Sequence, residues 1–429
     1  MQKIEHRQVA ETLYMDTLPN GLEVVILPKP DFNKTYATFT TRFGSVDNTF
    51  AVGDGEKVTV PDGIAHFLEH KMFEQPTGTD VFQEFARQGA SANAFTSFTR
   101  TAYLFSATSR VEDNLKTLID FVQTPHFTDQ NVEKEKGIIG QEIRMYDDNP
   151  DWRSYFGLIE AMYKNHPVRI DIAGTVESIA DITKELLYTC YETFYHPSNM
   201  LLFVVGPVDP ENILELVRNN QAAKTFEAPP RIRRFFESEP DQVNESLREV
   251  RLSVGVSKCL FGFKEASGRT GVKGDDLLKQ EMATKIALEA LIGPSSDLYQ
   301  ALYDDGLIDE TFGFDYTLED GYGFSMMGGD TRDPDALLER IRREFRVLTE
   351  KGIDAQTFDR LRKKSIGSQL RSLNSPEWIA NQFTRYRFNG ADMFRIIPVL
   401  EELRVDDINK RLREHVSWDR FAVSLVRPL

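Results

Sequence analysis

Two patterns mark strands in the first half of the chain: continuous apolar runs and alternation of apolar with polar residues. Residues 22–27 and 200–206 are strongly apolar, which is typical of buried strands. Residues 36–43 alternate with period two. Residues 91–97 and 101–107 are rich in strand-forming residues and are separated by a short connection, so they predict a β-hairpin.

Between these strands the apolar residues recur with helical spacing. In residues 111–124, for example, Leu115, Leu118, Ile119 and Val122 fall on one helical face. Thr79 or Asp80 can cap the start of the second predicted helix. The helices predicted in this half are 64–73, 81–88, 111–124, 129–148, 152–163 and 182–194.

The second half repeats the same order of elements, although residue identities do not visibly repeat. It opens with a β-rich run over 249–263. Its predicted strands are 308–316, 322–328 and 422–426, and its predicted helices are 277–291, 297–304, 334–348, 355–373 and 377–388. Such an order predicts two α+β domains of about 200 residues each, consistent with a duplication.

A stretch of different character separates the two halves. Residues 227–234 are rich in proline and charge, and we interpret them as part of an interdomain linker. The basic run could also be a binding patch, but a solvated linker is the favoured interpretation. We therefore predict a first domain over residues 1–222, a linker over 223–247 and a second domain over 248–429.

Charge and composition narrow the class of protein. The 429 residues include 51 Lys or Arg and 67 Asp or Glu, a formal net charge of −16. This acidic excess argues against nucleic acid and anionic membrane surfaces as partners. No apolar run reaches the roughly 18 residues of a membrane span. Residues 1–10 show no apolar targeting core, so we expect a cytoplasmic protein.

The strongest chemical signal is the sequence His66-Phe67-Leu68-Glu69-His70. Residues four apart share one face of a helix, so His66 and His70 can bind one metal ion. Glu69 lies on the adjoining turn, within reach of a water at the metal. Two imidazoles, a carboxylate and an open position describe a catalytic zinc site, here Zn²⁺. A chance coincidence of two exposed histidines is the alternative.

A third ligand is available from the predicted helix 129–148. Glu135 and Glu142 lie seven residues apart, two turns along one face. One can bind the metal and the other can orient a ligand histidine through its second ring nitrogen. Without the histidine motif, this helix would be read as an ordinary solvated face.

The order H-x-x-E-H, inverted relative to H-E-x-x-H, resembles that of the inverzincins. Together with the two glutamates, it resembles the insulinase/pitrilysin family of zinc peptidases, which includes the mitochondrial processing peptidase, and in particular its YmfH-like bacterial subgroup. The resemblance covers essentially the whole chain and implies two homologous α+β domains that form half of a clamshell. It implies His66, His70 and Glu142 as zinc ligands, Glu69 as general base and Glu135 as the orienting carboxylate.

A second match lies at residues 89–96. This run resembles the family's edge strand beside the zinc, to which an extended peptide adds as a further strand. The resemblance implies Ala92, Asn93, Ala94 and Phe95 as the residues that bind the peptide substrate. Taken by itself, the run would be a plain edge strand.

One family feature is missing. Active members usually carry an Arg and a Tyr seven residues apart in the second domain, where they hold the substrate carbonyl. Here Tyr303 stands at the Arg position and Asp309 at about the Tyr position. Losing an oxyanion donor typically costs about 10²–10³ in rate. Some family heterodimers place the zinc and the Arg/Tyr pair on different chains. We therefore predict the metal-bearing half of a heterodimer with a homologous partner subunit; an inactive homodimer is the alternative.

Three functions remain open. The favoured one is a zinc-dependent endopeptidase that cleaves short or unfolded peptides held in a chamber. The others are a non-catalytic scaffold of the family and a metal-dependent peptide-binding subunit. An intact ligand set and base argue against the scaffold, and turnover would distinguish the peptidase from the peptide-binding subunit.

Overall fold

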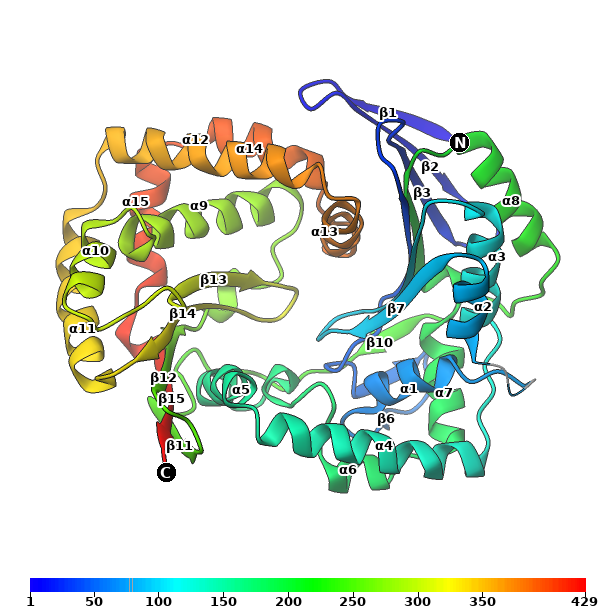
Figure 1. The fold of residues 1–429 in the computed structure, drawn as a ribbon, viewed down its shortest axis with the longest axis horizontal. Coiled ribbons are helices and arrows are strands. Elements are labelled where there is room, and N and C mark those ends of the chain that lie inside the picture. The colour runs from blue at the N-terminus through cyan, green and yellow to red at the C-terminus, as the bar shows by residue number, and fades with distance from the viewer. Residues whose placement is uncertain (77, 79) are drawn as a thin grey trace. The chain divides into compact units, whose positions relative to one another are not determined.

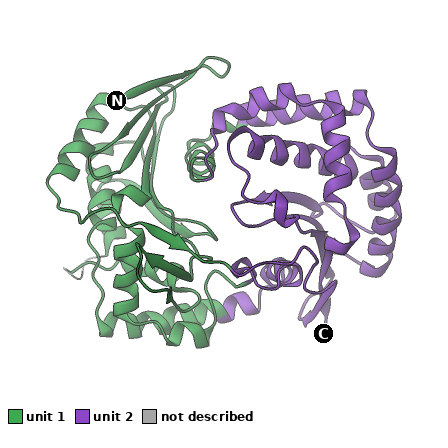
Figure 2. Ribbon diagram, turned by 180° about the vertical axis from the view of Figure 1, so that it is seen from behind, with its two compact units in different colours: residues 1–143, 170–236, 372–388 green, residues 144–169, 237–371, 389–429 purple. Residues whose placement is uncertain are grey.

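The structure is a computed structural model that describes residues 1–76, 78 and 80–429. These residues divide into two compact units, coloured separately in Figure 2. The first consists of Met1–Ile143, Ile170–Phe236 and Ser372–Phe388. The second consists of Arg144–Arg169, Glu237–Arg371 and Asn389–Leu429.

A mostly antiparallel sheet forms the centre of the first unit (Figure 1). Its described strands, in spatial order, are β1 (Gln2–His6), β2 (Glu11–Thr17), β3 (Glu23–Pro28), β9 (Met200–Gly206), β4 (Thr35–Thr41), β8 (Thr101–Ala107) and β7 (Ala90–Thr96). The pair β3–β9 is parallel and the other neighbours are antiparallel. The central strands β4 and β9 are buried along their whole length, which explains the strongly apolar sequence of β9.

Helices cover both faces of this sheet. They are α1 (Ile64–Met72), α2 (Val81–Arg87), α3 (Val111–Val122), α4 (Asp129–Asp147), α6 (Val176–Ala180), α7 (Lys184–Phe194), α8 (Pro210–Ala222) and α13 (Pro376–Phe388). In β9, Leu202 and Val204 join the core that includes α3 and α8. The intervening Phe203 points to the other face, where its ring lies 5.0 Å from that of Phe383 in α13.

A small second sheet corrects our interpretation of the linker. Its order is β10-β5-β6, formed by β5 (Thr49–Val52), β6 (Val58–Thr59) and β10 (Ile232–Arg234). Arg234 Nε donates to Asp47 Oδ1 at 2.5 Å, and the Asp47 side chain is only 2 % exposed. Part of the basic run, residues 232–234, is therefore a strand rather than a solvated linker. The buried carboxylate of Asp47 pairs with the guanidinium of Arg234 and compensates its charge.

The second unit has the same sheet topology. Its described strands, in spatial order, are β11 (Leu247–Leu252), β15 (Phe421–Pro428), β12 (Ser257–Phe263), β14 (Gly323–Thr331) and β13 (Gly313–Leu318). The pair β11–β15 is parallel and the others are antiparallel. This order matches β3-β9-β4-β8-β7 strand for strand. The predicted fold class, two homologous α+β domains with mostly antiparallel sheets, is confirmed.

The helices of the second unit also follow the order of the first. They are α5 (Pro150–Met162), α9 (Gly274–Ile292), α10 (Asp297–Asp304), α11 (Pro334–Lys351), α12 (Ala355–Ser372), α14 (Ile396–Glu402) and α15 (Val405–His415). Short 3-10 turns complete the described elements: η1 (Pro167–Arg169), η2 (Pro197–Asn199), η3 (Ser267–Arg269), η4 (Met393–Arg395) and η5 (Trp418–Arg420).

Two equivalent helices are exchanged between the units. In sequence, α5 lies between α4 and α6, yet it belongs to the second unit and contacts β11, β12 and β15. At Gly157, α5 and β15 approach closely, and a Cβ there would lie 2.5 Å from Ser424 Oγ, so the serine hydroxyl would have to move. Conversely, α13 lies between α12 and α14 but contacts β4 and β9 of the first unit. The predicted boundaries at residues 222 and 248 follow chain order and do not include this exchange.

Most predicted elements form within a few residues of their expected ends. The hairpin is confirmed as β7 and β8, and all the helices predicted above are present. Asp80 caps α2 by accepting a hydrogen bond from the Phe82 amide at 2.9 Å, whereas Thr79 lies outside the described residues. The hairpin β1–β2 was not predicted. Across the described residues, no helix has the length and apolar character needed to cross a lipid bilayer.

Candidate metal centre

The histidine motif lies on α1, a short and mostly buried helix of the first unit. It begins after Gly63, whose φ of 88° and close approach to the Ala173 carbonyl leave no room for a side chain. One turn of helix separates His66 from His70, and their rings lie 4.6 Å apart. The helix therefore presents both imidazoles on the same side, as the spacing predicted.

Helix α4 brings Glu142 to these two rings. Glu142 Oε1 lies 3.8 Å from His66 Nε2, and Oε2 lies 3.7 Å from His70 Nε2. The three groups each offer a ligand atom, and these atoms all lie within 4.8 Å of one another. Such separations are too long for direct hydrogen bonds. They are close to the roughly 3.4 Å that separates ligands at about 2.0–2.1 Å from a tetrahedral zinc.

Glu135, two turns earlier on α4, orients the second histidine. Its Oε1 lies 3.1 Å from His70 Nδ1, which directs Nε2 toward Glu142. Burial pushes the pKa of Glu135 upward, but its contacts with His70 and Lys71 outweigh this effect and leave that pKa below its ordinary value. Glu135 is therefore an anion at neutral pH. Burial lowers the pKa of His70, but the hydrogen bond that Glu135 accepts from His70 and the nearby carboxylates outweigh burial and raise this pKa overall.

His66 is held neutral. Burial, with a smaller contribution from the neighbouring His70, lowers its pKa to about 4. Its Nδ1 is buried and has no hydrogen-bond partner among the described residues. A neutral imidazole is the form that binds a metal, so the environment of His66 fits a ligand.

Glu69 lies beside this cluster and has a different environment. Its side chain is buried, and burial raises the pKa of its carboxyl. Thr96 Oγ1 donates to Glu69 Oε2 at 2.6 Å, which partly opposes that rise. A carboxylate with a raised pKa is a better proton acceptor near neutral pH than an exposed one.

The predicted peptide-binding residues lie on β7, the strand that ends at Thr96. Among the described strands, β7 pairs with β8 on one side and is the last of its sheet. Asn93 is exposed, and its Oδ1 accepts a hydrogen bond from the Ala94 amide at 2.9 Å. The free edge of this strand therefore leads directly to the residue that holds Glu69.

Tyr303 and Asp309, at the positions where the Arg/Tyr pair was expected, do not replace that pair. Tyr303 lies on α10 with 52 % of its surface exposed. Asp309 accepts hydrogen bonds from the amide and hydroxyl of Thr311 in the loop before β13. Neither side chain offers the guanidinium of the missing pair.

His166 and His196, which lie outside this cluster, have structural contacts. His166 Nδ1 accepts from the Val168 amide at 3.1 Å. His196 Nδ1 accepts from the Ser198 amide, and its Nε2 lies 3.1 Å from the Glu227 carbonyl oxygen. Among the residues that the structure describes, the group placed to hold a metal ion is His66, His70 and Glu142, on α1 and α4.

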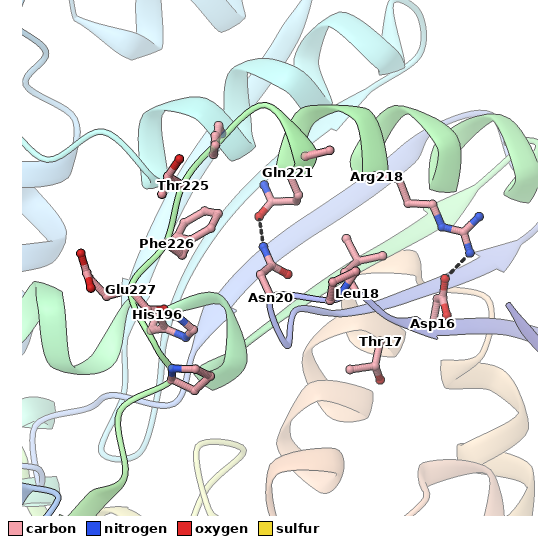
Figure 3. Close-up of a pocket in the computed structure, with 14 residues that line it drawn as sticks. Asp16, Thr17, Leu18, Asn20, His196, Arg218, Gln221, Thr225, Phe226 and Glu227 are labelled. Carbon is pink, nitrogen blue, oxygen red and sulfur yellow. Dashed lines mark hydrogen bonds and ion pairs between the residues drawn. The ribbon is translucent and has the colours of Figure 1, made fainter.

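A cavity of about 870 Å³ lies elsewhere in the first unit (Figure 3). It is lined by the β2–β3 turn, the end of α8 and residues 224–229. Four strands separate β2 from β7 in the sheet, so the cavity is remote from the metal centre. Two pairs of its polar side chains contact each other, Asn20 with Gln221 and Arg218 with Asp16, as Figure 3 shows.

Sequence reasoning missed two residues of the site, Lys71 and Thr96. Lys71 follows the second histidine directly, and Nζ lies 3.2 Å from Glu135 Oε2. Thr96 ends the run that we assigned to peptide binding. Lys71 lies next to the first motif and Thr96 lies within the second run, but their partners lie on other elements and only the fold brings them together.

Comparison with known proteins identifies the family. Residues 50–176 match the family model "Insulinase (Peptidase family M16)", and residues 181–365 match the model "Peptidase M16 inactive domain". The chain is 57 % identical to the uncharacterized zinc protease YmfH of Bacillus subtilis (strain 168), over 100 % of this chain and 99 % of that protein.

Solved structures agree with this assignment. The structure of an M16-like peptidase from Alicyclobacillus acidocaldarius superposes with a TM-score of 0.94 at 45 % identity, covering 98 % of this chain and 99 % of that one. A protease from Helicobacter pylori shares the fold, with a TM-score of 0.80 at 20 % identity over 97 % and 99 % of the two chains. The resemblance read from the motif is thereby confirmed: this chain belongs to the insulinase family of peptidases (M16) and is similar to YmfH.

Proposed function

We propose that this chain is a zinc-dependent endopeptidase that acts on short or unfolded peptides, as the metal-bearing subunit of a dimer. The observation that carries the proposal is the convergence of His66, His70 and Glu142, with the buried carboxylate of Glu69 beside them. The relatives named as zinc proteases support the same chemistry.

The roles of the site residues follow from their environments. His66, His70 and Glu142 would hold zinc, and Glu135 keeps His70 turned toward it. Zinc, when bound, supplies a Lewis acid that lowers the pKa of water and polarises a carbonyl group. Glu69 takes the proton of the attacking water and then delivers it to the leaving amine. Its raised pKa suits both halves of this transfer.

Substrate binding would use the edge of β7. A peptide added as a further strand forms main-chain hydrogen bonds with Ala92–Phe95, and these bonds tolerate different side chains. The peptide would then run toward Thr96 and Glu69. Only an extended segment can pair in this way, which favours short or unfolded substrates.

The oxyanion donors must come from elsewhere. Tyr303 and Asp309 stand where active relatives usually carry Arg and Tyr, and neither replaces a guanidinium. We therefore propose a homologous partner subunit that carries the pair, with a homodimer as the alternative. The cytoplasm stays the predicted compartment, and nucleic acids and membranes stay outside the expected partners.

One observation favours a second function. Residues 181–365 match a model described as an inactive domain, and the oxyanion pair is missing. A non-catalytic scaffold or a peptide-binding subunit would need the fold and the edge strand but no turnover. The buried base and the complete ligand set favour the peptidase.

The decisive experiment is cleavage of a mixed peptide library by the purified, zinc-loaded chain. The same assay is run on Glu69→Gln and on Glu133→Gln, a control carboxylate that is 69 % exposed on α4. Cleavage that is lost only in Glu69→Gln supports a self-sufficient peptidase. Stoichiometric zinc without cleavage directs the search to a partner subunit. Absence of zinc binding, or equal cleavage by Glu69→Gln, would overturn the proposal.

A further inference from the structure

Lys71 places a buried charge directly behind the metal centre. It follows His70 on α1, and its side chain is 0 % exposed. Its neighbours on this helix, Leu68 and Met72, are apolar and equally buried. A buried ammonium group is strongly unfavourable unless carboxylates surround it, so the position of Lys71 must be compensated by specific partners.

Two carboxylates provide this compensation, and one of them belongs to the metal centre. Lys71 Nζ contacts Glu74, just beyond the end of α1, and lies 3.2 Å from Glu135 Oε2 on α4. Glu135 therefore makes a contact with each of its oxygens: Oε2 with Lys71, and Oε1 with His70 Nδ1 at 3.1 Å. The carboxylate is fixed at both ends and cannot rotate without breaking one of these contacts.

We propose that Lys71 is a positioning residue of the metal centre, which acts through Glu135 to keep the Nε2 atom of His70 turned toward the metal. The inference rests on the proposed metal-dependent function. With the ammonium removed, Glu135 would keep one partner and gain rotational freedom, and the imidazole would lose its fixed acceptor. Outer partners of this kind typically change metal affinity by about 10–100-fold.

The positive charge of Lys71 does not change the expectation that removing its ammonium group weakens metal binding. A cation near a metal site would by itself repel the metal. Here Glu74, 37 % exposed, pairs with the same ammonium, so the Lys71–Glu74 pair is neutral as seen from the ligands. In Lys71→Met, Glu74 can turn to solvent, and the main change at the site is the loss of the contact to Glu135.

The test is a double-mutant cycle in zinc affinity, measured by competition with a chelating dye. We expect Lys71→Met to weaken zinc binding at least about 10-fold in the wild-type background and less than about 3-fold in Glu135→Gln. Lys264→Met is the matched control, because Lys264 is also buried, 2 % exposed, and its carboxylate partner Glu239 belongs to the second unit, whereas the candidate ligands belong to the first. Equal weakening in both backgrounds, or tighter binding by Lys71→Met, would overturn the inference.

A measurement on the metal-free wild type covers the case in which Lys71→Met does not fold. The ¹⁵N shifts of His70, recorded well above its titration range, should report the tautomer with hydrogen on Nδ1, and the Lys71 ammonium should exchange slowly with solvent. The Nε2–H tautomer, or rapid exchange at Lys71, would overturn the inference without any variant. Failure of the wild type to bind zinc would instead refute the proposed function, and the tautomer would still decide the role of Lys71.

Discussion

Glu135 and Glu69 have different pKa shifts because their surroundings differ. Glu135 contacts an ammonium and an imidazole, which keep its pKa below the ordinary value. Glu69 has one hydroxyl donor and is otherwise desolvated, so its pKa is raised. Carboxylates whose environments push their pKa values apart can take different roles in one site. The mechanism proposed above accordingly assigns the orientation of a ligand to Glu135 and the transfer of a proton to Glu69.

The assignment of Glu142 as the third ligand can be tested directly. Glu142→Ala leaves two imidazoles, and we expect zinc affinity to fall by more than the roughly 10–100-fold typical of an outer partner. The metal content after dialysis against a weak chelator measures this change. Unchanged occupancy would exclude Glu142 as a ligand, and Glu133→Ala on the exposed side of α4 is the control.

Thr96 should affect turnover without affecting the metal. Thr96→Val removes the hydroxyl that donates to Glu69 Oε2 and keeps the shape of the side chain. Losing one hydrogen bond to the charged base should lower kcat about 10-fold, with zinc affinity unchanged. Thr96→Ser should restore the rate. A fall in zinc affinity, or normal kcat in the Val variant, would contradict this role.

The sequence predicted the candidate ligands and the base of the site, but not the residues that contact and position them. His66, Glu69 and His70 lie within five residues, so helix geometry alone places them together. Glu142 needed the resemblance to a family, because nothing local connects α4 to α1. Lys71 and Thr96 could not be found in this way, since a lysine or a threonine acquires its role only from the partner that the fold brings to it.

At the scale of elements, the edge of β7 carries a testable requirement. The Ala94 amide points away from β8 and is satisfied by the Asn93 side chain. Ala94→Pro would remove this donor while keeping the pairing with β8. We expect about 10-fold weaker peptide binding, measured by calorimetry in the Glu69→Gln background to prevent turnover.

Two control measurements show whether Ala94→Pro leaves the rest of the protein unchanged. Zinc affinity and the thermal midpoint should stay at the Glu69→Gln values, which shows that the strand is still in place. Peptide affinity that does not change would mean that the peptide does not add to this edge at Ala94.

The segment after β10 is anchored by one carboxylate. Glu239 accepts hydrogen bonds from the amides of Lys164, Asn165 and His166 and from Lys264. Burial raises the pKa of Glu239, but these donors outweigh burial and lower it overall. A pKa lowered by folding adds stability above the ordinary glutamate range, and this stability is lost as the pH falls through the folded value.

A chemical-denaturation series against pH tests this anchor. Glu239→Gln should lower the free energy of unfolding by about 1.5–3 kcal/mol at neutral pH. The variant should also lose less stability than the wild type between neutral pH and the acid range. Parallel pH curves for the two proteins would show that Glu239 does not carry the acid sensitivity.

The local pattern of apolar and polar residues predicted most helices and strands. It failed for segments whose structure depends on contacts with distant parts of the chain. The sequence of β9 predicts a strand because both of its faces are buried. The hairpin β1–β2 was missed because β1 is polar and lies at the sheet edge. Residues 232–234 read as linker because of their charge, whereas Asp47 and β5 make them a strand. No local pattern says which sheet α5 or α13 covers.

At the scale of the whole molecule, the exchange of α5 and α13 predicts that the two halves of the sequence are not separable. A fragment of residues 1–236 would contain the metal ligands but would lack α13, which covers β4 and β9. We expect it to show poor amide protection in those strands and to bind zinc weakly, as measured by hydrogen exchange and metal titration. Adding residues 372–388 as a peptide should improve both. A fragment that is stable and binds zinc normally would contradict this prediction.

The same exchange sets an order of events during synthesis. The three proposed metal ligands have all been translated by residue 142, but the helix that covers the other face of the first unit's sheet ends at Phe388. At about 5–20 residues per second, roughly 150 residues between the end of the first unit's second segment and α13 take about 8–30 s to translate. During this time the nascent sheet exposes Phe203 and its neighbours, so the growing chain should be a client of ribosome-associated chaperones until almost nine-tenths of it has been made.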